Sequence, residues 1–360
     1  MARALPLLRG EPPQPEVRVM IVDDSAVVRA VLARMLAAHE GFQVVGSAGS
    51  APEALGLLGQ LDVDIILLDL EMPGIGGLAA LPDLLAAGHG AKVLIVSSAC
   101  AEGAAATVSA LRLGAADTLV KPGAVGFAGH FAEELVERMA RIAHPRTHVA
   151  PHHEPTHSFT PAPVVPIACI GIGASTGGVH ALATFFHALP ASVTAPILIT
   201  QHLPAPFMPY FVPQLAEMAS RPVRLAAAGL RPTEGEIMLA PGDGSLSLAR
   251  FGGEVHIRLD RRRSASGFLP SVDPMMATIG ECYGPAAVGV MLSGMGRDGA
   301  TGAETLVAAG GTLWAQDAQT SVVWGMPGAV ANAGLAQDVL PPEAIASAIA
   351  YRSGGGGAWR

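Results

Sequence analysis

Short apolar runs alternate with helical stretches along the first third of the chain. The runs are rich in leucine or β-branched residues and cover residues 17–22, 43–48, 65–68, 93–96 and 118–120. Apolar residues at helical spacing fill the intervals, over residues 26–38, 52–60, 78–87 and 103–113. Strands that are apolar on both faces are typical of a parallel sheet covered by helices on each side. The pattern therefore predicts five βα repeats that form a parallel α/β domain over residues 17–140.

The second half of the chain carries the same kind of pattern. Buried apolar runs cover residues 167–173, 196–200 and 286–292, and a helical stretch follows the first run as far as residue 189. This pattern favours a doubly wound, mainly parallel α/β domain over residues 166–352.

A proline- and histidine-rich segment separates the two predicted domains. Residues 144–166 hold six prolines and five histidines and show neither helical nor strand periodicity. Because proline removes a backbone donor and fixes φ, we interpret residues 141–165 as an extended linker. Its histidines could bind a metal, but no pattern fixes their geometry. Residues 1–16 and 353–360 are predicted to be flexible ends.

Polar residues follow four strands of the first predicted sheet, at the ends where a parallel sheet places its ligand site. They are Asp23, Asp24, Asp69, Ser97 and Lys121. Three converging carboxylates repel each other unless a cation lies among them, and carboxylate oxygens suit Mg²⁺. A carboxylate beside Mg²⁺, with a hydroxyl and an ammonium group opposite, can accept a phosphoryl group. If the strand register differs by one residue, Ser98 supplies the hydroxyl in place of Ser97.

These strand ends resemble the receiver domain of two-component response regulators, over residues 17–140, which implies a flavodoxin-like (βα)5 fold for this half. The flanking Leu68-Asp-Leu-Glu-Met-Pro73 and Lys121-Pro122 follow the family pattern, whereas Gly76-Gly77 stands where many receivers have Asp-Gly. The resemblance implies that Asp69 is the phosphoacceptor and that Ser97 and Lys121 support the phosphoryl group. It also implies that Asp23, Asp24 and Asp69 bind Mg²⁺, and that a histidine kinase is the phosphodonor.

The first strand of the second domain runs into a glycine-rich turn, Gly173-Ala-Ser-Thr-Gly-Gly178. Gly-x-Ser-x-Gly at a strand-to-helix turn fits the spacing of a nucleophile elbow, with Ser175 as the nucleophile. The N-terminus of the following helix favours developing negative charge. The same turn also fits an anion- or nucleotide-binding loop with Ser175 as the N-cap.

Two further polar residues follow later strands of this domain. His202 follows the run at 196–200, and Asp298 lies in the loop after the run at 286–292. Polar groups at three strand ends are the arrangement that a Ser-His-Asp triad requires. The chain order Ser175, His202, Asp298 differs from the Ser, Asp/Glu, His order of α/β-hydrolases, so a lipase or esterase of that fold is disfavoured.

An ordered set of motifs resembles the catalytic domain of chemotaxis protein-glutamate methylesterases, the CheB family, over residues 166–351. The motifs are Gly173-Ala-Ser-Thr-Gly-Gly178, Gln201-His-Leu-Pro204, Pro270-Ser-Val-Asp273, and the segments 292–300 and 315–327. The resemblance implies hydrolysis of glutamate γ-methyl esters on methyl-accepting chemotaxis receptors, releasing methanol, and deamidation of receptor glutamines. It further implies that the unphosphorylated receiver covers the catalytic cleft and that phosphorylation relieves this inhibition.

The same resemblance assigns roles to the site residues. Ser175 is the nucleophile, His202 the general base and Asp298 the residue that orients His202. The Met295 backbone contributes to the oxyanion site, and Thr176 hydrogen-bonds His202. This chemistry needs no metal or organic cofactor.

Several residues near these motifs depart from the family pattern or remain open. Phe268-Leu269 stand where family members often carry basic or histidine residues, and Ala318 stands where an acidic residue is common. Arg261-Arg262-Arg263 could meet acidic receptor segments, although a solvated hairpin turn is the favoured interpretation. Asp273 is interpreted as structural.

Composition narrows the class of protein. Hydrophobic residues make up 50% of the chain, but no run of 18 uncharged apolar residues exists, so we expect no membrane insertion. The first 15 residues lack a continuous apolar segment and hold four prolines, which argues against a secretory signal. Three scattered cysteines are typical of reduced thiols, and we expect a cytoplasmic protein. The net charge of −8 opposes general nucleic-acid affinity.

Three alternative functions are weighed against the methylesterase. A general serine hydrolase on small esters is disfavoured by the chain order and the motif set. A regulator whose second half only binds partners is opposed by the complete triad. A DNA-binding response regulator is opposed by the acidic balance and by the lack of a helix-turn-helix signal.

Basic residues are almost all arginine. Only Lys92 and Lys121 are lysines among the 22 basic residues. Lysine's compact ammonium and arginine's planar fork are not equivalent beside a crowded phosphoryl group. We therefore interpret Lys121 as a functional position and Lys92 as a solvated surface residue.

Overall fold

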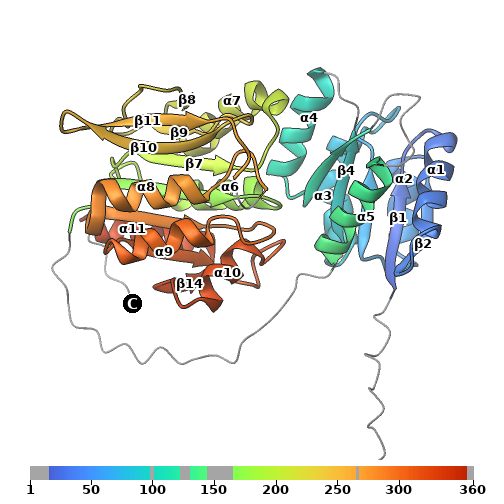
Figure 1. Cartoon of the computed structure of the whole chain (residues 1–360). Helices are drawn as coiled ribbons and strands as arrows, with labels where there is room; N and C mark the ends of the chain where they lie inside the picture. The colour runs from blue at the N-terminus through green and yellow to red at the C-terminus, as the bar shows by residue number, and fades with distance from the viewer. Residues whose placement is uncertain (1–15, 98–100, 122–129, 144–164, 265–266, 355–360) are drawn as a thin grey trace, which may run out of the picture.

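A computed structural model describes residues 16–97, 101–121, 130–143, 165–264 and 267–354. Two parallel β-sheets, each flanked by helices, lie next to one another (Figure 1). The predicted linker residues from 144 to 164, including their histidines, fall outside the described part of the chain. No helix among the described residues is long and apolar enough to cross a membrane.

The first sheet has five parallel strands in the order β2-β1-β3-β4-β5, which is the flavodoxin-like order. Its strands are β1 (Val17–Val22), β2 (Phe42–Ala48), β3 (Ile65–Leu68), β4 (Lys92–Ser97) and β5 (Asp117–Val120). Its helices are α1 (Ala26–Ala37), α2 (Ala51–Leu58), α3 (Gly77–Ala87), α4 (Ala101–Arg112) and α5 (His130–Ala143). The predicted fold of this half is confirmed, and its strands begin and end within one residue of the predicted positions.

The second sheet has seven strands in the order β14-β13-β12-β6-β7-β9-β8, and every neighbouring pair is parallel. Its strands are β6 (Cys169–Ala174), β7 (Ile197–Gln201), β8 (Val223–Leu225), β9 (Ile237–Leu239), β12 (Ala287–Met291), β13 (Thr312–Gln316) and β14 (Asp338–Leu340). The central strands β6, β7 and β12 are buried along their whole length. They match the predicted apolar runs, and the doubly wound, parallel fold is confirmed.

Helices cover both faces of this second sheet. One face packs against α6 (Gly178–Ala188), α7 (Met208–Ala219) and α11 (Pro342–Arg352). The other packs against α8 (Asp273–Tyr283), α9 (Ala300–Ala308) and α10 (Met326–Asn332). The described part of this half also contains two single turns of 3₁₀ helix, η1 (Ala205–Phe207) and η2 (Gly284–Ala286). Burial of alternate strand residues on both faces explains why the sequence showed continuous apolar runs.

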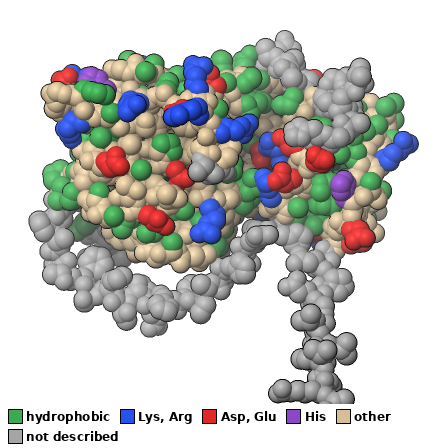
Figure 2. All heavy atoms as spheres, viewed as in Figure 1, with side chains coloured by type: hydrophobic (Ala, Val, Ile, Leu, Met, Phe, Trp, Pro, Cys, Tyr) green, Lys and Arg blue, Asp and Glu red, His purple; other side chains and the backbone are tan. Residues whose placement is uncertain are grey.

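A separate hairpin of β10 (Ser245–Phe251) and β11 (Glu254–Asp260) packs over α8. Its turn lies at Gly252-Gly253, both at positive φ. The interpretation of Arg261-Arg262-Arg263 as a hairpin turn is therefore wrong, because these arginines follow β11. Arg261 and Arg262 are exposed and pair with Asp243 and Asp260. Basic and acidic side chains lie intermixed on the face of the second half shown in Figure 2.

The two halves contact each other through α4 of the first and α6 and α7 of the second (Figure 1), and β5 adds a hydrogen bond from Thr176 to Asp117. Gln214 Nε2 donates to Ser109 Oγ at 3.0 Å, and Arg112 pairs with Glu217 at 3.3 Å. The Gly177 amide donates to the carbonyl of Ala116 at 2.8 Å. Since α6 begins at Gly178, this contact places the first half against the turn that carries Ser175.

Candidate active site

Three acidic residues of the first half meet in one cluster, the acidic cluster, at the carboxyl ends of β1 and β3. One carboxylate oxygen from each of Asp23, Asp24 and Asp69 lies within 4.8 Å of the others. Asp23 and Asp69 are buried, whereas Asp24 is exposed. Lys121 Nζ lies 2.7 Å from both Asp23 Oδ2 and Asp69 Oδ2. The structure thus brings together four of the five polar strand ends that the sequence singled out.

The electrostatics of this acidic cluster suit an added cation. Burial raises the pKa of Asp69, and the nearby Asp23 adds to that rise, although Lys121 opposes it. Burial alone would lower the pKa of Lys121, but its hydrogen bonds with Asp23 and Asp69 outweigh burial and raise it. Three carboxylates share a single ammonium group, and their donor atoms are all oxygen. This donor set fits Mg²⁺.

Ser97, the fifth polar strand end, is buried and connects β4 to α4. Its hydroxyl lies 2.9 Å from Thr107 Oγ1 in α4. The Lys121 amide donates to the Ser97 carbonyl at 2.7 Å, which ties the ends of β4 and β5 together. Ser98 falls outside the described residues. Because α4 also contacts the second half, Ser97 connects the acidic cluster to the interface between the halves.

Ser175 occupies the turn between β6 and α6. Its amide donates to the Ser293 carbonyl at 3.0 Å, and the residue is buried. Gly177 has φ +74°, and a Cβ there would lie 2.5 Å from Val322 Cβ. Only glycine therefore fits this position, and the turn that presents Ser175 depends on it.

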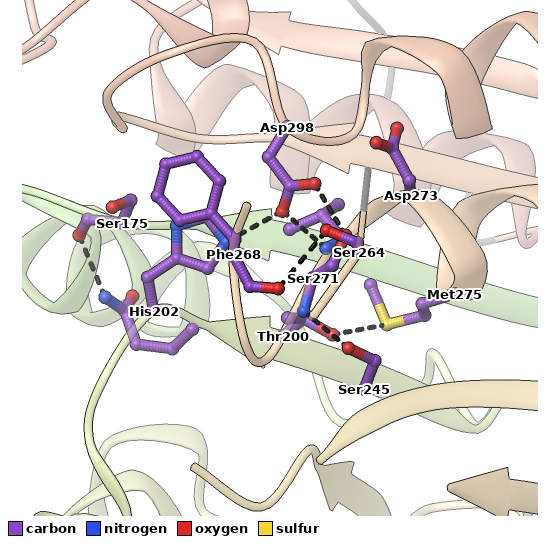
Figure 3. A network of polar contacts seen from close by, with 12 residues as sticks. Ser175, Thr200, His202, Ser245, Ser264, Phe268, Ser271, Asp273, Met275 and Asp298 are labelled. Carbon is purple, nitrogen blue, oxygen red and sulfur yellow. Dashed lines mark hydrogen bonds and ion pairs between the residues drawn. The ribbon is translucent and has the colours of Figure 1, made fainter. Parts of the chain in front are cut away.

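His202 follows β7 directly beside Ser175. Ala174 and Gln201 are paired in the β6–β7 register, and the His202 amide donates to the Ala174 carbonyl at 3.0 Å. Figure 3 shows His202 between Ser175 and Asp298. His202 Nε2 lies 2.8 Å from Asp298 Oδ2. The three predicted triad residues therefore converge at the carboxyl ends of the strands.

Asp298 is buried and receives several hydrogen bonds. Ser271 Oγ donates to Asp298 Oδ1 at 2.6 Å, and the Val272 amide donates to Oδ2 at 2.6 Å. Burial alone would raise the pKa of Asp298, but the hydrogen bonds from His202, Ser271 and Val272 outweigh it and lower the pKa to about 2. The carboxylate is ionised at neutral pH. Ser271 was not singled out from the sequence, although its motif was.

The ionised Asp298 fixes the tautomer of His202. A carboxylate can only accept, so Nε2 carries the proton and Nδ1 of the neutral ring carries the lone pair. Nδ1 is buried and has no hydrogen-bond partner among the described residues. The ring is thus turned over relative to the chymotrypsin arrangement, in which the carboxylate binds Nδ1. Nδ1 is the nitrogen that can take a proton from Ser175.

The residues given auxiliary roles have other contacts in this structure. Thr176 Oγ1 donates to Asp117 Oδ2 of β5 at 2.9 Å, so its hydroxyl is engaged by the first half rather than by His202. Met295 lies in the loop after β12. A Cβ on the preceding Gly294 would lie 2.9 Å from Ser175 Cβ, which places this loop against the nucleophile.

Asp273, the first residue of α8, caps the N-terminal turn of α9. Its Oδ1 accepts from the Gly302 amide at 2.9 Å. Burial raises the pKa of Asp273, and the neighbouring Asp298 raises it further. These contacts support a structural role, as the sequence suggested.

Known families match both halves of the chain. A CheB methylesterase family model matches residues 170–349, and a response regulator receiver domain model matches residues 19–126. A protein-glutamate methylesterase/protein-glutamine glutaminase 2 of Caulobacter vibrioides is 42% identical over 346 residues, covering 93% of this chain and 99% of the relative. A protein-glutamate methylesterase/protein-glutamine glutaminase 1 of Paramagnetospirillum magneticum is 37% identical, covering 93% and 96% of the two chains. A crystal structure of the Thermotoga maritima CheB methylesterase catalytic domain is 34% identical, with a TM-score of 0.49, and covers 51% of this chain and 98% of that one.

Proposed function

This chain belongs to the CheB methylesterase family, and on that premise we propose that it is a phosphorylation-regulated chemotaxis methylesterase. Its substrates would be glutamate γ-methyl esters on methyl-accepting chemotaxis receptors, and its products glutamate and methanol. Acting in the cytoplasm, it would also deamidate receptor glutamines; its relatives are named protein-glutamine glutaminases as well as methylesterases. The observation that carries the proposal is the His202–Asp298 pair beside Ser175.

The first half of the reaction forms an ester on Ser175. Ser175 Oγ attacks the ester carbonyl while His202 Nδ1 takes its proton, and the negative Asp298 stabilises the resulting imidazolium. The tetrahedral intermediate then expels the methoxy group. The imidazolium gives its proton to that oxygen, so methanol leaves and the glutamyl group stays bound to Ser175.

Water completes the reaction by the reverse route. His202 Nδ1 takes a proton from the water as its oxygen attacks the acyl carbon, and then returns a proton to Ser175 Oγ. Glutamate is released and the enzyme is restored. Deamidation follows the same steps, with ammonia leaving in place of methanol.

Developing negative charge on the carbonyl oxygen needs donors close to Ser175. We assign this role to the Met295 backbone, in the loop that lies against Ser175, together with the N-terminus of α6. Once released from Asp117, the Thr176 hydroxyl would be able to hydrogen-bond His202.

Control of the activity is assigned to the receiver, residues 17–140. Asp69 would accept a phosphoryl group from a histidine kinase, with Mg²⁺ held by Asp23, Asp24 and Asp69. When bound, the ion would neutralise charge on the transferred group. Lys121 would contact the same group.

The route from Asp69 to the active site would run through Ser97. Its hydroxyl would turn from Thr107 towards the phosphoryl group and so release α4. Because α4 and β5 contact the second half beside the Ser175 turn, such a change would loosen the cover over the site. The catalytic domain is assigned to residues 166–352 and the linker to 141–165.

Methanol release from methylated receptor membranes tests the proposal. The chain should release methanol faster with a small-molecule phosphodonor than without it. Ser175→Ala should abolish release under both conditions, and Asp69→Asn should abolish only the stimulation. Deamidation is followed in the same membranes as ammonia release.

A further inference from the structure

Phe268 stacks on the proposed general base. Its ring centroid lies 4.4 Å from that of the His202 imidazole, and the two planes are 10° apart (Figure 3). The residues are far apart in the sequence: His202 follows β7, whereas Phe268 belongs to the loop between β11 and α8. This contact is therefore made by the tertiary fold and not by local chain geometry.

The loop that carries Phe268 also positions Asp298, the third member of the triad, which itself lies in the loop after β12. Ser271 and Val272, a few residues further on, donate the hydrogen bonds that fix Asp298. Both the backbone amide and the hydroxyl of Ser264 donate to the Phe268 carbonyl at 3.2 Å, which anchors the loop on its other side. The same loop thus contacts the face of the His202 ring and holds the Asp298 carboxylate at the Nε2 edge of that ring.

The hydrogen bond to Asp298 does not by itself fix the imidazole plane. It restrains only the Nε2 edge, and Nδ1 has no hydrogen-bond partner among the described residues. A ring held at one edge can swing, which moves Nδ1 relative to Ser175 Oγ. The parallel ring of Phe268 opposes such a swing because it covers one face of the imidazole.

The stacked geometry also favours the charged form of the base. His202 becomes an imidazolium only while the tetrahedral intermediate forms and breaks down. A cation over the face of an aromatic ring, within about 6 Å of its centroid, is attracted by the ring's electron density. An interaction that grows as the transition state forms raises kcat rather than substrate affinity.

Phe268 also lies beside the loop that carries Met295. Phe268 is half-buried and lines a cavity of about 670 Å³ together with Met295, Gly296 and Arg297. A Cβ on Gly296 would lie 3.6 Å from the Phe268 ring, so the ring is in contact distance of the Met295 loop. Phe268 therefore lies between His202, the proposed general base, and the Met295 loop, whose backbone is the proposed oxyanion site.

We propose that Phe268 is a positioning residue, which holds the His202 ring in the plane needed for proton transfer and stabilises its imidazolium. This inference rests on the methylesterase function proposed above. It concerns the aromatic face rather than the volume of the side chain. An aliphatic residue of similar size would fill the space but would lack the aromatic face.

The experiment compares Phe268→Leu, Phe268→Tyr and Phe268→Trp in the full chain, treated with phosphodonor. Phe268→Leu should lower kcat for methanol release by about tenfold, or ~1.4 kcal/mol, and leave KM unchanged. Phe268→Tyr and Phe268→Trp should restore kcat to within about threefold of the original, because both keep an aromatic face. Phe251→Leu is the matched control, since Phe251 also contacts a histidine, His256, but lies on the exposed hairpin.

A second readout does not depend on the receptor. Inactivation by phenylmethanesulfonyl fluoride requires Ser175 and His202 but no receptor, and its rate should fall in Phe268→Leu as kcat does. Equal losses in the leucine and tyrosine variants, or a change in KM alone, would overturn the proposal. If Phe268→Leu does not fold, the same comparison is made between Phe268→Met and Phe268→Tyr.

The two readouts also separate this inference from the proposed function. If the chain releases no methanol from receptors but reacts with the sulfonyl fluoride at a rate that depends on Phe268, the positioning role of Phe268 is supported. The same result refutes methylated receptors as the substrate. Normal methanol release that is unaffected by Phe268→Leu refutes the role of Phe268 alone.

Discussion

Loss of the Asp117 carboxylate should activate the enzyme without phosphorylation. Asp117 Oδ2 accepts the Thr176 hydroxyl at 2.9 Å, one residue from the nucleophile. It is the contact by which the receiver engages a side chain of the active-site turn. Asp117→Ala removes it and also removes the ion pair between Asp117 and Arg138 at 3.0 Å, but Arg138 keeps its bonds to Glu134 and to the Thr118 carbonyl, both at 2.8 Å.

The size of the effect follows from the chemistry of the contact. A hydrogen bond to a charged group contributes about 1.5–3 kcal/mol when both partners are buried. The Asp117 side chain is 19% exposed, so water competes for it and the lower end applies. About 1.5 kcal/mol corresponds to roughly a tenfold shift from the docked towards the undocked arrangement. The bonds from Gly177 and Gln214 to the receiver remain, so docking is weakened and not abolished.

The assay measures methanol release from methylated receptor membranes without any phosphodonor. Asp117→Ala is placed in an Asp69→Asn background, so that stray phosphorylation cannot contribute. Basal release should rise about tenfold over Asp69→Asn alone, up to the rate of the phosphorylated chain. Asp62→Ala is the control, because Asp62 is 87% exposed and pairs with Arg18 at the far end of the sheet. An unchanged basal rate in the double variant would refute this reasoning.

Three further predictions concern residues whose contacts are defined above. Lys121→Arg should leave the fold intact but prevent activation by a phosphodonor, because arginine cannot replace the compact ammonium group between Asp23 and Asp69; normal activation would remove the special role of Lys121. Ser271→Ala should lower kcat about tenfold with KM unchanged, since Asp298 loses a 2.6 Å hydrogen bond, and equal kinetics in both proteins would contradict this. The pKa of Asp298 is lowered to about 2 from the ordinary 3.8, so its ionised form contributes about 2 kcal/mol of stability, fully present above about pH 4 and lost as the pH falls through 2. Urea unfolding should therefore show that Asp298→Asn loses less stability than the original chain when the pH falls from about 5 to 2. Equal losses of stability in the two proteins would argue against this.

The strands and the residues at their ends were predictable from the sequence, because apolar runs and local turn chemistry determine both. The two predicted sheets, the Ser175 turn and the placement of His202 after β7 all follow from such local patterns. The short strands β8, β9 and β14 were missed, since three residues give too little periodicity. The hairpin turn at Gly252-Gly253 was also missed, although two glycines between strands are a recognised turn signal.

Contacts between distant segments could not be predicted in this way. The Thr176 hydroxyl bonds to Asp117 only because α4 and β5 pack beside α6, and no local pattern encodes that docking. The orientation of the His202 ring depends on Ser271 and Val272, which fix the Asp298 carboxylate from another loop. The stacking of Phe268 on His202 likewise depends on tertiary packing.

The most direct test of the account is methanol release from methylated receptor membranes by the original chain, Ser175→Ala and Asp69→Asn, each with and without acetyl phosphate. We expect release by the original chain that acetyl phosphate stimulates, no release by Ser175→Ala, and basal release without stimulation by Asp69→Asn. Release that persists in Ser175→Ala, together with stimulation that persists in Asp69→Asn, would contradict the account in both halves of the chain.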